Sequence, residues 1–297
     1  MRIVTTTEHV FTEDRPIFRQ LDLLLESGFR YIDFTACCFI GPGRKYGDTI
    51  FFSDDWKPWI RDIRAYADKK GIVFTQTHNL MYNYFTGSEE SELLNRMMDR
   101  VFEACGILGA PLTVVHPIAP PGAAGNIPEC LRRNAAFFRE KADRAAEHGV
   151  QLAVENMIVT RNFDGTTYWR YCSTPEQLIE LVDAIDKPNV GFCFDVGHSH
   201  YMHENVYESV LKYGRRLISL HIHDNNLSDD QHVAPYSGSL DWDAFLKGLV
   251  DVRYAGDFSL ESFRSTIRLP EETQPDMLRA MYRLSEWMVR RMDAFRV

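Results

Sequence analysis

Short apolar or β-branched segments alternate with longer helix-like segments from one end of the chain to the other. This alternation is typical of repeated βα units, which assemble into a parallel sheet. Eight strand-like segments occur in the 297 residues, at 2–6, 31–35, 72–78, 111–116, 151–155, 190–195, 217–223 and 257–261. The repetition therefore predicts an α/β fold with eight parallel strands.

Helix-like segments lie between these strands. Examples are 53–70, 88–108, 128–148, 174–185 and 240–251, and a last one near 271–292 covers the end of the sequence. Ser88 precedes an acidic first turn, and Thr174 precedes Pro175, which are both signals for the start of a helix. Gly71 and Gly149 stand just before the next strand, where they are expected to end a helix.

The number of βα units and the lack of a linker favour one closed barrel. No Gly/Ser-rich or Pro-rich tract divides the chain, and eight units in about 250 to 300 residues match a (β/α)₈ TIM barrel. An open doubly wound sheet would usually carry a glycine-rich phosphate turn after its first strand. Thr6, Thr7, Glu8 and His9 occupy that turn here. We expect a single TIM-barrel domain over residues 1–297.

The charge and the cysteine content limit the kinds of partner and the compartment to be expected. Lys and Arg total 33 against 42 Asp and Glu, and the net charge of -9 opposes binding to nucleic acid. The first residues show no basic stretch followed by an apolar one, and charged or turn residues interrupt the apolar runs, so no signal or membrane span is expected. The six cysteines are scattered, which suits reduced thiols in the cytoplasm. We expect a cytoplasmic protein with a small-molecule partner, and a homo-oligomer remains open.

Ionisable residues end one predicted strand after another. They are His78, His116, Glu155, Asp195, His221 and Glu261. The carboxyl ends of barrel strands meet at one rim, where barrel enzymes have their active sites. A carboxylate after an apolar strand is costly to bury without a cation or hydrogen bonds. The pattern predicts a divalent metal, and mixed carboxylate and imidazole ligands suit Mn²⁺, Zn²⁺, Co²⁺ or Fe²⁺.

Further polar residues follow the sixth and seventh strands. His198 comes three residues after Asp195, and we interpret Gly197 between them as the residue that permits the turn. His200 and His203 are expected at the surface or in a supporting role. Strand alternation places His223 on the same face as His221, as a substrate contact or a support. A single histidine after a strand is more often a hydrogen-bonded structural residue, so His78 or His116 alone would be weak evidence.

The ordered blocks VEN (154–156), FDVGH (194–198), HIHDNN (221–226), DQH (230–232) and LES (260–262) resemble those of the xylose isomerase-like barrels. The similarity spans nearly the whole chain. Within that superfamily the chain is similar to the sugar phosphate isomerase/epimerase group, which includes ketose 3-epimerases. The resemblance implies one divalent ion, with Mn²⁺ favoured and Zn²⁺, Co²⁺, Fe²⁺ or Mg²⁺ as alternatives. Its ligands would be Glu155, Asp195, His221 and Glu261.

The function expected from this set is proton abstraction next to a carbonyl of a sugar or sugar derivative. Glu155 and Glu261 would act as the catalytic base and acid on either side of an enediolate stabilised by the metal. The substrate-binding candidates are His198, His116, His78, His223 and Trp169. Phe39 and Tyr236 on long loops could also cover a sugar. Ketose epimerases of the tagatose type place an arginine where Leu227 and Ser228 stand here, so the sugar stays open.

Three alternatives remain. The superfamily also contains endonuclease IV-type enzymes with a trinuclear zinc cluster, and extra ligands for such a cluster are available in His78, His116, His198, Asp230 and His232. The acidic charge argues against a DNA substrate. A metal-dependent sugar lyase, including one that cleaves a C-glycoside, would begin with the same proton removal. A barrel that only binds a sugar or a partner is the non-enzymatic alternative.

Overall fold

The computed structural model describes residues 1–40, 50–161 and 167–296. The described residues divide into two compact units. The first comprises Met1–Phe34, Tyr66–Thr75 and Cys193–Val297, and the second comprises Thr35–Ala65 and Gln76–Phe192. The expectation of a single domain over residues 1–297 stays a prediction.

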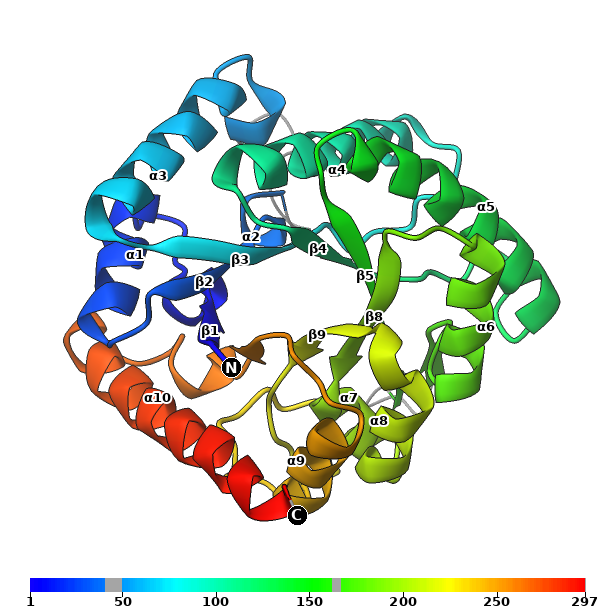
Figure 1. Ribbon diagram of the computed structural model, residues 1–297. Helices are drawn as coiled ribbons and strands as arrows, with labels where there is room; N and C mark the ends of the chain where they lie inside the picture. Colours follow the sequence, from blue (N-terminus) through cyan, green and yellow to red (C-terminus); the bar gives the residue numbers. More distant parts are fainter. Residues whose placement is uncertain (41–49, 162–166, 297) are drawn as a thin grey trace. The chain divides into compact units, whose positions relative to one another are not determined.

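A parallel sheet forms the centre of the first unit (Figure 1). In it β1 (Ile3–Thr6) lies between β10 (Phe258–Leu260) and β2 (Tyr31–Thr35), with Ile3 opposite Phe258 and Thr6 opposite Asp33. On the other side of β10, Ile222 just after β9 (Leu217–His221) forms a parallel bridge to Leu260. The end of β8 (Val190–Asp195) neighbours β9. All these strands end at one edge, so residues at their carboxyl ends come together.

Helices cover this sheet. They are α1 (Ile17–Glu26), α7 (Val196–Tyr201), α8 (Val206–Tyr213), α9 (Trp242–Asp251) and α10 (Gln274–Arg291). In Figure 1 the red α10 runs beside α1 and α9, and these helices contact it. Short 3-10 turns extend the strand ends, with Thr7–Val10 after β1 and Phe263–Ser265 after β10. Asp195 caps α7 by accepting from the backbone N–H of His198 at 2.7 Å, so the strand-to-helix turn depends on a predicted ligand.

The second unit repeats the same arrangement of strand and helix. Its strands are β3 (Val73–His78, from Gln76 onward), β4 (Leu112–Val115), β5 (Gln151–Glu155) and the beginning of β8. They are parallel, with Thr77 opposite Thr113 and Leu112 opposite Gln151. Its helices are α2 (Cys37–Ile40), α3 (Trp56–Lys70, up to Ala65), α4 (Glu89–Leu108), α5 (Ile127–Ala146) and α6 (Pro175–Ile185).

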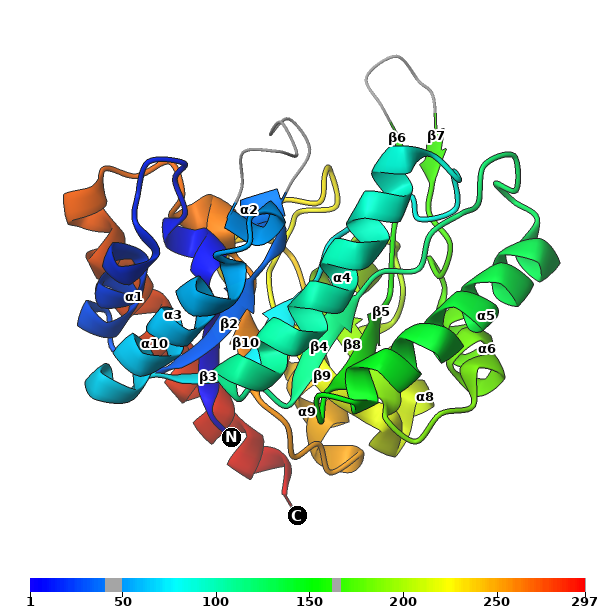
Figure 2. The same cartoon turned by 90° about the horizontal axis from the view of Figure 1, so that it is seen from above.

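The long connection after β5 contains a two-stranded antiparallel hairpin that was not predicted. It consists of β6 (Val159–Arg161) and β7 (Thr167–Trp169). Figure 2 shows it at the end of this unit where α4 begins. Its middle, 162–166, lies outside the described residues, as do residues 41–49 in the long connection that follows β2.

The predicted elements are found at nearly their predicted bounds. Strands 31–35, 151–155 and 190–195 agree residue for residue, whereas the seventh strand ends at His221 instead of His223. Helix α4 begins after Ser88, whose hydroxyl accepts from the Ser91 backbone N–H, and α6 begins after Thr174. Among the described residues, no helix is long and apolar enough to cross a membrane.

Candidate metal centre

Three predicted ligands lie at the carboxyl ends of strands in the first unit. Asp195 ends β8, His221 ends β9, and Glu261 follows β10 directly. All three side chains are buried, and Asp195 and His221 have no exposed surface. His221 Nδ1 lies 3.3 Å from Glu261 Oε2. Two carboxylates and an imidazole buried this deeply form a donor set that suits a divalent cation of the Mn²⁺ to Zn²⁺ series.

Asp195 is held by His223. The Nε2 of His223 lies 2.9 Å from Oδ1 and 3.1 Å from Oδ2 of Asp195, and both side chains are fully buried. These contacts are those of a residue that supports Asp195. Contact of His223 with substrate remains a prediction.

Gly197 is needed for a different reason from the one the sequence suggested. It is not among the residues with positive φ, so the turn after Asp195 does not require it. A Cβ at this position would lie 2.0 Å from Cε1 of His223. The glycine therefore makes room for the imidazole that holds Asp195.

A second set of donors lies beside this one in the first unit. His198, His223, Asp230 and His232 each offer one ligand atom, and these atoms lie within 4.8 Å of one another. Asp230 Oδ2 is 3.0 Å from His232 Nε2 and 3.5 Å from His198 Nε2. The His232 ring stacks on His223 with centroids 3.8 Å apart. The structure thus brings the DQH block to the strand ends.

The charges in this set stabilise one another. Burial would raise the pKa of Asp230, but His232 and His198 outweigh burial and hold that pKa well below its usual range. Burial lowers the pKa of His232, but Asp230 and Glu261 reverse the effect and raise it to about 9. His232 also contacts the backbone oxygen of Glu261 through Nδ1 at 3.0 Å.

Asp224 closes the loop that carries Asp230 and His232. This buried carboxylate accepts from the backbone N–H of Leu240 at 3.2 Å and from Trp242 Nε1 at 3.1 Å, and its backbone pairs with Val233. Gly238 packs against Asp224 at the end of this loop, where a Cβ would lie 2.4 Å from Asp224 Oδ1. Residues 225–239 are therefore fixed at their base by hydrogen bonds to one side chain.

Two residues near the donors were missed by the sequence interpretation. Asp33 on β2 is fully buried, with Oδ2 3.7 Å from His221 Nε2. His9 after β1 is also buried, with Nδ1 2.9 Å from Thr266 Oγ1. Burial lowers the pKa of His9 to about 3 despite the nearby Glu261 carboxylate, so this imidazole is neutral. An acidic residue inside an apolar strand was the signal for Asp33, whereas His9 looked like an ordinary loop residue.

The second unit contains its own cluster of predicted residues. His116 Nε2 lies 2.8 Å from His78 Nε2 and 3.0 Å from Glu155 Oε2, and all three side chains are buried. The two imidazole rings stack with centroids 4.8 Å apart. The ends of β3, β4 and β5 thus bring together three side chains that could hold a metal ion, and the predicted substrate-binding roles of His78 and His116 stay predictions.

The predicted aromatic residues have other neighbours. Trp169 on β7 has its ring 6.3 Å from that of Tyr171, and Phe39 stands edge-on to Trp59 at 5.2 Å. Tyr236 is 48% exposed and lies against Trp242 and Trp287. Substrate contact by Trp169 stays a prediction.

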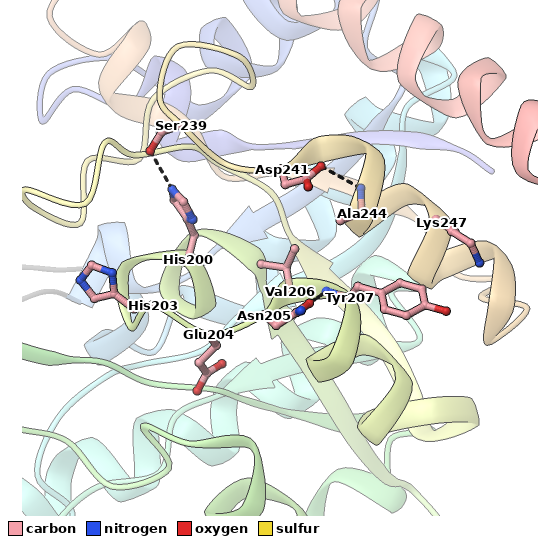
Figure 3. Close-up of a pocket in the computed structure, with 10 residues that line it drawn as sticks. All are labelled: His200, His203, Glu204, Asn205, Val206, Tyr207, Ser239, Asp241, Ala244 and Lys247. Carbon is pink, nitrogen blue, oxygen red and sulfur yellow. Dashed lines mark hydrogen bonds between the residues drawn. The ribbon is translucent and has the colours of Figure 1, made fainter.

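A hollow of about 690 Å³ lies beside α7, α8 and α9 in the first unit (Figure 3). His200 lines it and contacts Ser239 Oγ through Nε2 at 3.0 Å. Figure 3 shows His203, Glu204 and Lys247 pointing in different directions, so their polar groups do not converge on one point. None of the predicted metal ligands lines this hollow, and the positions of His200 and His203 agree with a surface or supporting role.

The fold and these strand-end donors define a class of protein, and a family comparison identifies it. Residues 21–284 match the family model described as xylose isomerase-like TIM barrel. The chain belongs to this family, and the predicted (β/α)₈ TIM-barrel fold is confirmed. A solved structure described as D-tagatose 3-epimerase-like protein has the same fold. Its TM-score is 0.71 at 23% identity, covering 97% of this chain and 100% of that one.

Curated relatives are similar over part of their length. An uncharacterized protein, MJ1311, of Methanocaldococcus jannaschii is 32% identical over 158 residues, 52% of each chain. An inosose isomerase of Bacillus velezensis is 29% identical over 55% of this chain and 58% of its own. A ketose 3-epimerase of Arthrobacter globiformis is 25% identical over 61% and 57%. The chain thus spans little more than half the length of these relatives.

Proposed function

We propose that this protein is an isomerase or epimerase of a sugar or sugar derivative, and that it moves a proton on a carbon next to a carbonyl with the help of a divalent cation. The observation that carries the proposal is the buried set of Asp195, His221 and Glu261 at neighbouring strand ends. The similarity to an inosose isomerase and to a ketose 3-epimerase supports the isomerase or epimerase part of the proposal.

The donor chemistry fits a divalent cation. His221 and Glu261 direct a nitrogen and an oxygen toward each other at 3.3 Å, and Asp195 is kept in place by His223. Glu155 is proposed as the fourth ligand because it ends the predicted fifth strand in the VEN block. Mn²⁺ is the proposed ion, with Zn²⁺, Co²⁺, Fe²⁺ and Mg²⁺ as alternatives. When bound, the ion would polarise the substrate carbonyl and stabilise negative charge on its oxygen.

The chain's own carboxylates would then move the proton. Glu155 and Glu261 are proposed to remove it and return it, from opposite faces of one carbon in an epimerase or across two neighbouring carbons in an isomerase. Glu261 is fixed for this purpose by His221 at 3.3 Å and His232 at 3.7 Å. Substrate hydroxyls are proposed to contact the histidines His78, His116, His198 and His223, and Trp169 to cover the sugar.

A second candidate function is phosphodiester hydrolysis at a cluster of zinc ions. Two further donor sets support it, namely His78 with His116 and Glu155, and Asp230 with His198, His223 and His232. In this case Asp230 and His232 would bind an additional ion. The net charge of -9 disfavours a nucleic-acid substrate.

The metal content of protein purified without added metal separates the two candidates. About one Mn²⁺, Fe²⁺, Co²⁺ or Zn²⁺ per chain by elemental analysis supports the isomerase or epimerase, and about three Zn²⁺ supports the hydrolase. The reaction is then tested on inososes and ketoses in D₂O, where wild type should exchange the proton next to the carbonyl.

Glutamine substitutions provide the matched test of the carboxylates. Glu155→Gln and Glu261→Gln should abolish deuterium exchange, and Glu271→Gln, which alters a surface pair with Arg19, should not. Full exchange in either of the first two variants would contradict the proposed acid and base.

A further inference from the structure

The His221 ring lies between two buried carboxylates. Its Nδ1 faces Glu261 Oε2 at 3.3 Å, and its Nε2 faces Asp33 Oδ2 at 3.7 Å. The side chains of His221 and Asp33 are 0% and 1% exposed, so solvent does not reach either of them. The Nδ1 edge of the ring therefore faces Glu261, a proposed metal ligand, and the Nε2 edge faces Asp33, which is not among the four proposed ligands.

An imidazole binds a metal through a ring nitrogen that carries no proton. In a neutral histidine one ring nitrogen carries the proton and the other is the acceptor. If His221 uses Nδ1, the nitrogen beside Glu261, its proton must be on Nε2. A buried N–H needs an acceptor, and a carboxylate at this position fixes both the tautomer and the orientation of the ring.

Asp33 is well placed to be that acceptor. It lies within β2, opposite Thr6 of β1, so its backbone is fixed on a paired strand. A fully buried carboxylate is costly to keep ionised without a partner that carries a proton or a positive charge. The Nε2–H edge of His221 supplies such a partner at 3.7 Å, and a small shift of either side chain would complete the hydrogen bond.

We propose that Asp33 is the positioning residue of the metal centre, which holds His221 in the Nε2–H tautomer with Nδ1 directed to the cation. The inference rests on the proposed metal centre. Asp33 itself neither binds the ion nor contacts substrate. Partners of this kind typically change metal affinity about 10- to 100-fold when they are removed.

The test compares Asp33→Asn, Asp33→Ala and wild type in Mn²⁺ affinity, measured by competition with a chelator. Asp33→Ala should lower Mn²⁺ affinity about 10- to 100-fold. Asp33→Asn keeps the size of the side chain and a neutral acceptor, so it should lower the affinity less. The control is Asp257→Asn. Asp257 pairs with Arg2 at 2.6 Å, at the opposite end of β10, and its loss should leave Mn²⁺ affinity unchanged.

A second measurement distinguishes positioning from general support. The ¹⁵N shifts of His221 in protein loaded with diamagnetic Zn²⁺ report its tautomer, which should be Nε2–H with Nδ1 bound to the ion in wild type and in Asp257→Asn, and mixed in Asp33→Ala. Wild-type affinity and an unchanged tautomer in both Asp33 variants would overturn the inference, and Asp33→Asn keeps the test decisive if Asp33→Ala does not fold. A wild-type protein without Mn²⁺ affinity would instead overturn the metal centre on which the inference rests.

Discussion

His223 hydrogen bonds from Nε2 to Oδ2 of Asp195 at 3.1 Å, and the same nitrogen lies 2.9 Å from Oδ1. Asp195 also accepts from the backbone N–H of His198 at 2.7 Å. Because these donors fix a buried carboxylate at the end of β8, Asp195 is oriented before any ligand arrives. Orientation by neighbouring groups is what a precise metal or substrate site requires.

His223→Ala should weaken metal binding without removing a proposed ligand. The variant leaves the Asp195 carboxylate buried with one donor fewer, which should cost about 1–3 kcal/mol of unfolding free energy. Metal affinity should fall about 10- to 100-fold. Urea unfolding and chelator competition measure the two effects, and His223→Gln, which can keep a donor near the Nε2 position, should recover part of both. Unchanged affinity in His223→Ala would contradict the supporting role.

Gly197→Ala should act through His223. The added Cβ would lie 2.0 Å from the imidazole, so the ring must move away from Asp195. Overpacking of this kind typically costs about 1–3 kcal/mol. In the His223→Ala background the same substitution should be nearly harmless, because the atoms that it meets are gone. Equal costs of Gly197→Ala in both backgrounds would show that the glycine serves another purpose.

The strand ends were predictable from the sequence, but their supporting groups were not. Apolar runs that end in Asp195 or His221 reveal both the strand and the position of its last residue, since parallel strands end at one edge. The role of His223 depends on the contact of its ring with Asp195 beside Gly197, which joins the residues after β9 to the end of β8 and the start of α7. His9 and Asp33 are distant in sequence from the residues that they approach, so only the folded arrangement of β1, β2 and β10 reveals them.

Asp224 should control the order of the 225–239 loop. Asp224→Asn replaces one acceptor oxygen with an amide group, and Trp242→Phe removes the indole donor. Each should speed hydrogen exchange of the backbone amides in 225–239, and each should destabilise the fold by about 1–3 kcal/mol. If the Asp224–Trp242 bond is the connection that matters, the double variant should cost less than the sum of the single ones. Additive costs with unchanged exchange in the loop would contradict this.

His9 should make the protein sensitive to acid. Its folded-state pKa is about 3, well below the ordinary value of 6.5, so between these pH values the unfolded chain binds a proton that the folded one does not. The stability associated with the neutral imidazole is therefore fully present above pH 6.5 and is lost as the pH falls toward 3.

The expected slope from this residue is about 1.4 kcal/mol per pH unit within that window. His9→Asn removes the titration and can retain the contact with Thr266 Oγ1 that His9 makes through Nδ1. Urea unfolding of metal-depleted protein at pH 4.5, 5.5 and 7.5 should give a smaller acid loss in the variant than in wild type. His148→Asn, at an exposed position in the second unit, is the control and should keep the wild-type slope. Parallel pH profiles for His9→Asn and wild type would mean that other groups carry the acid sensitivity.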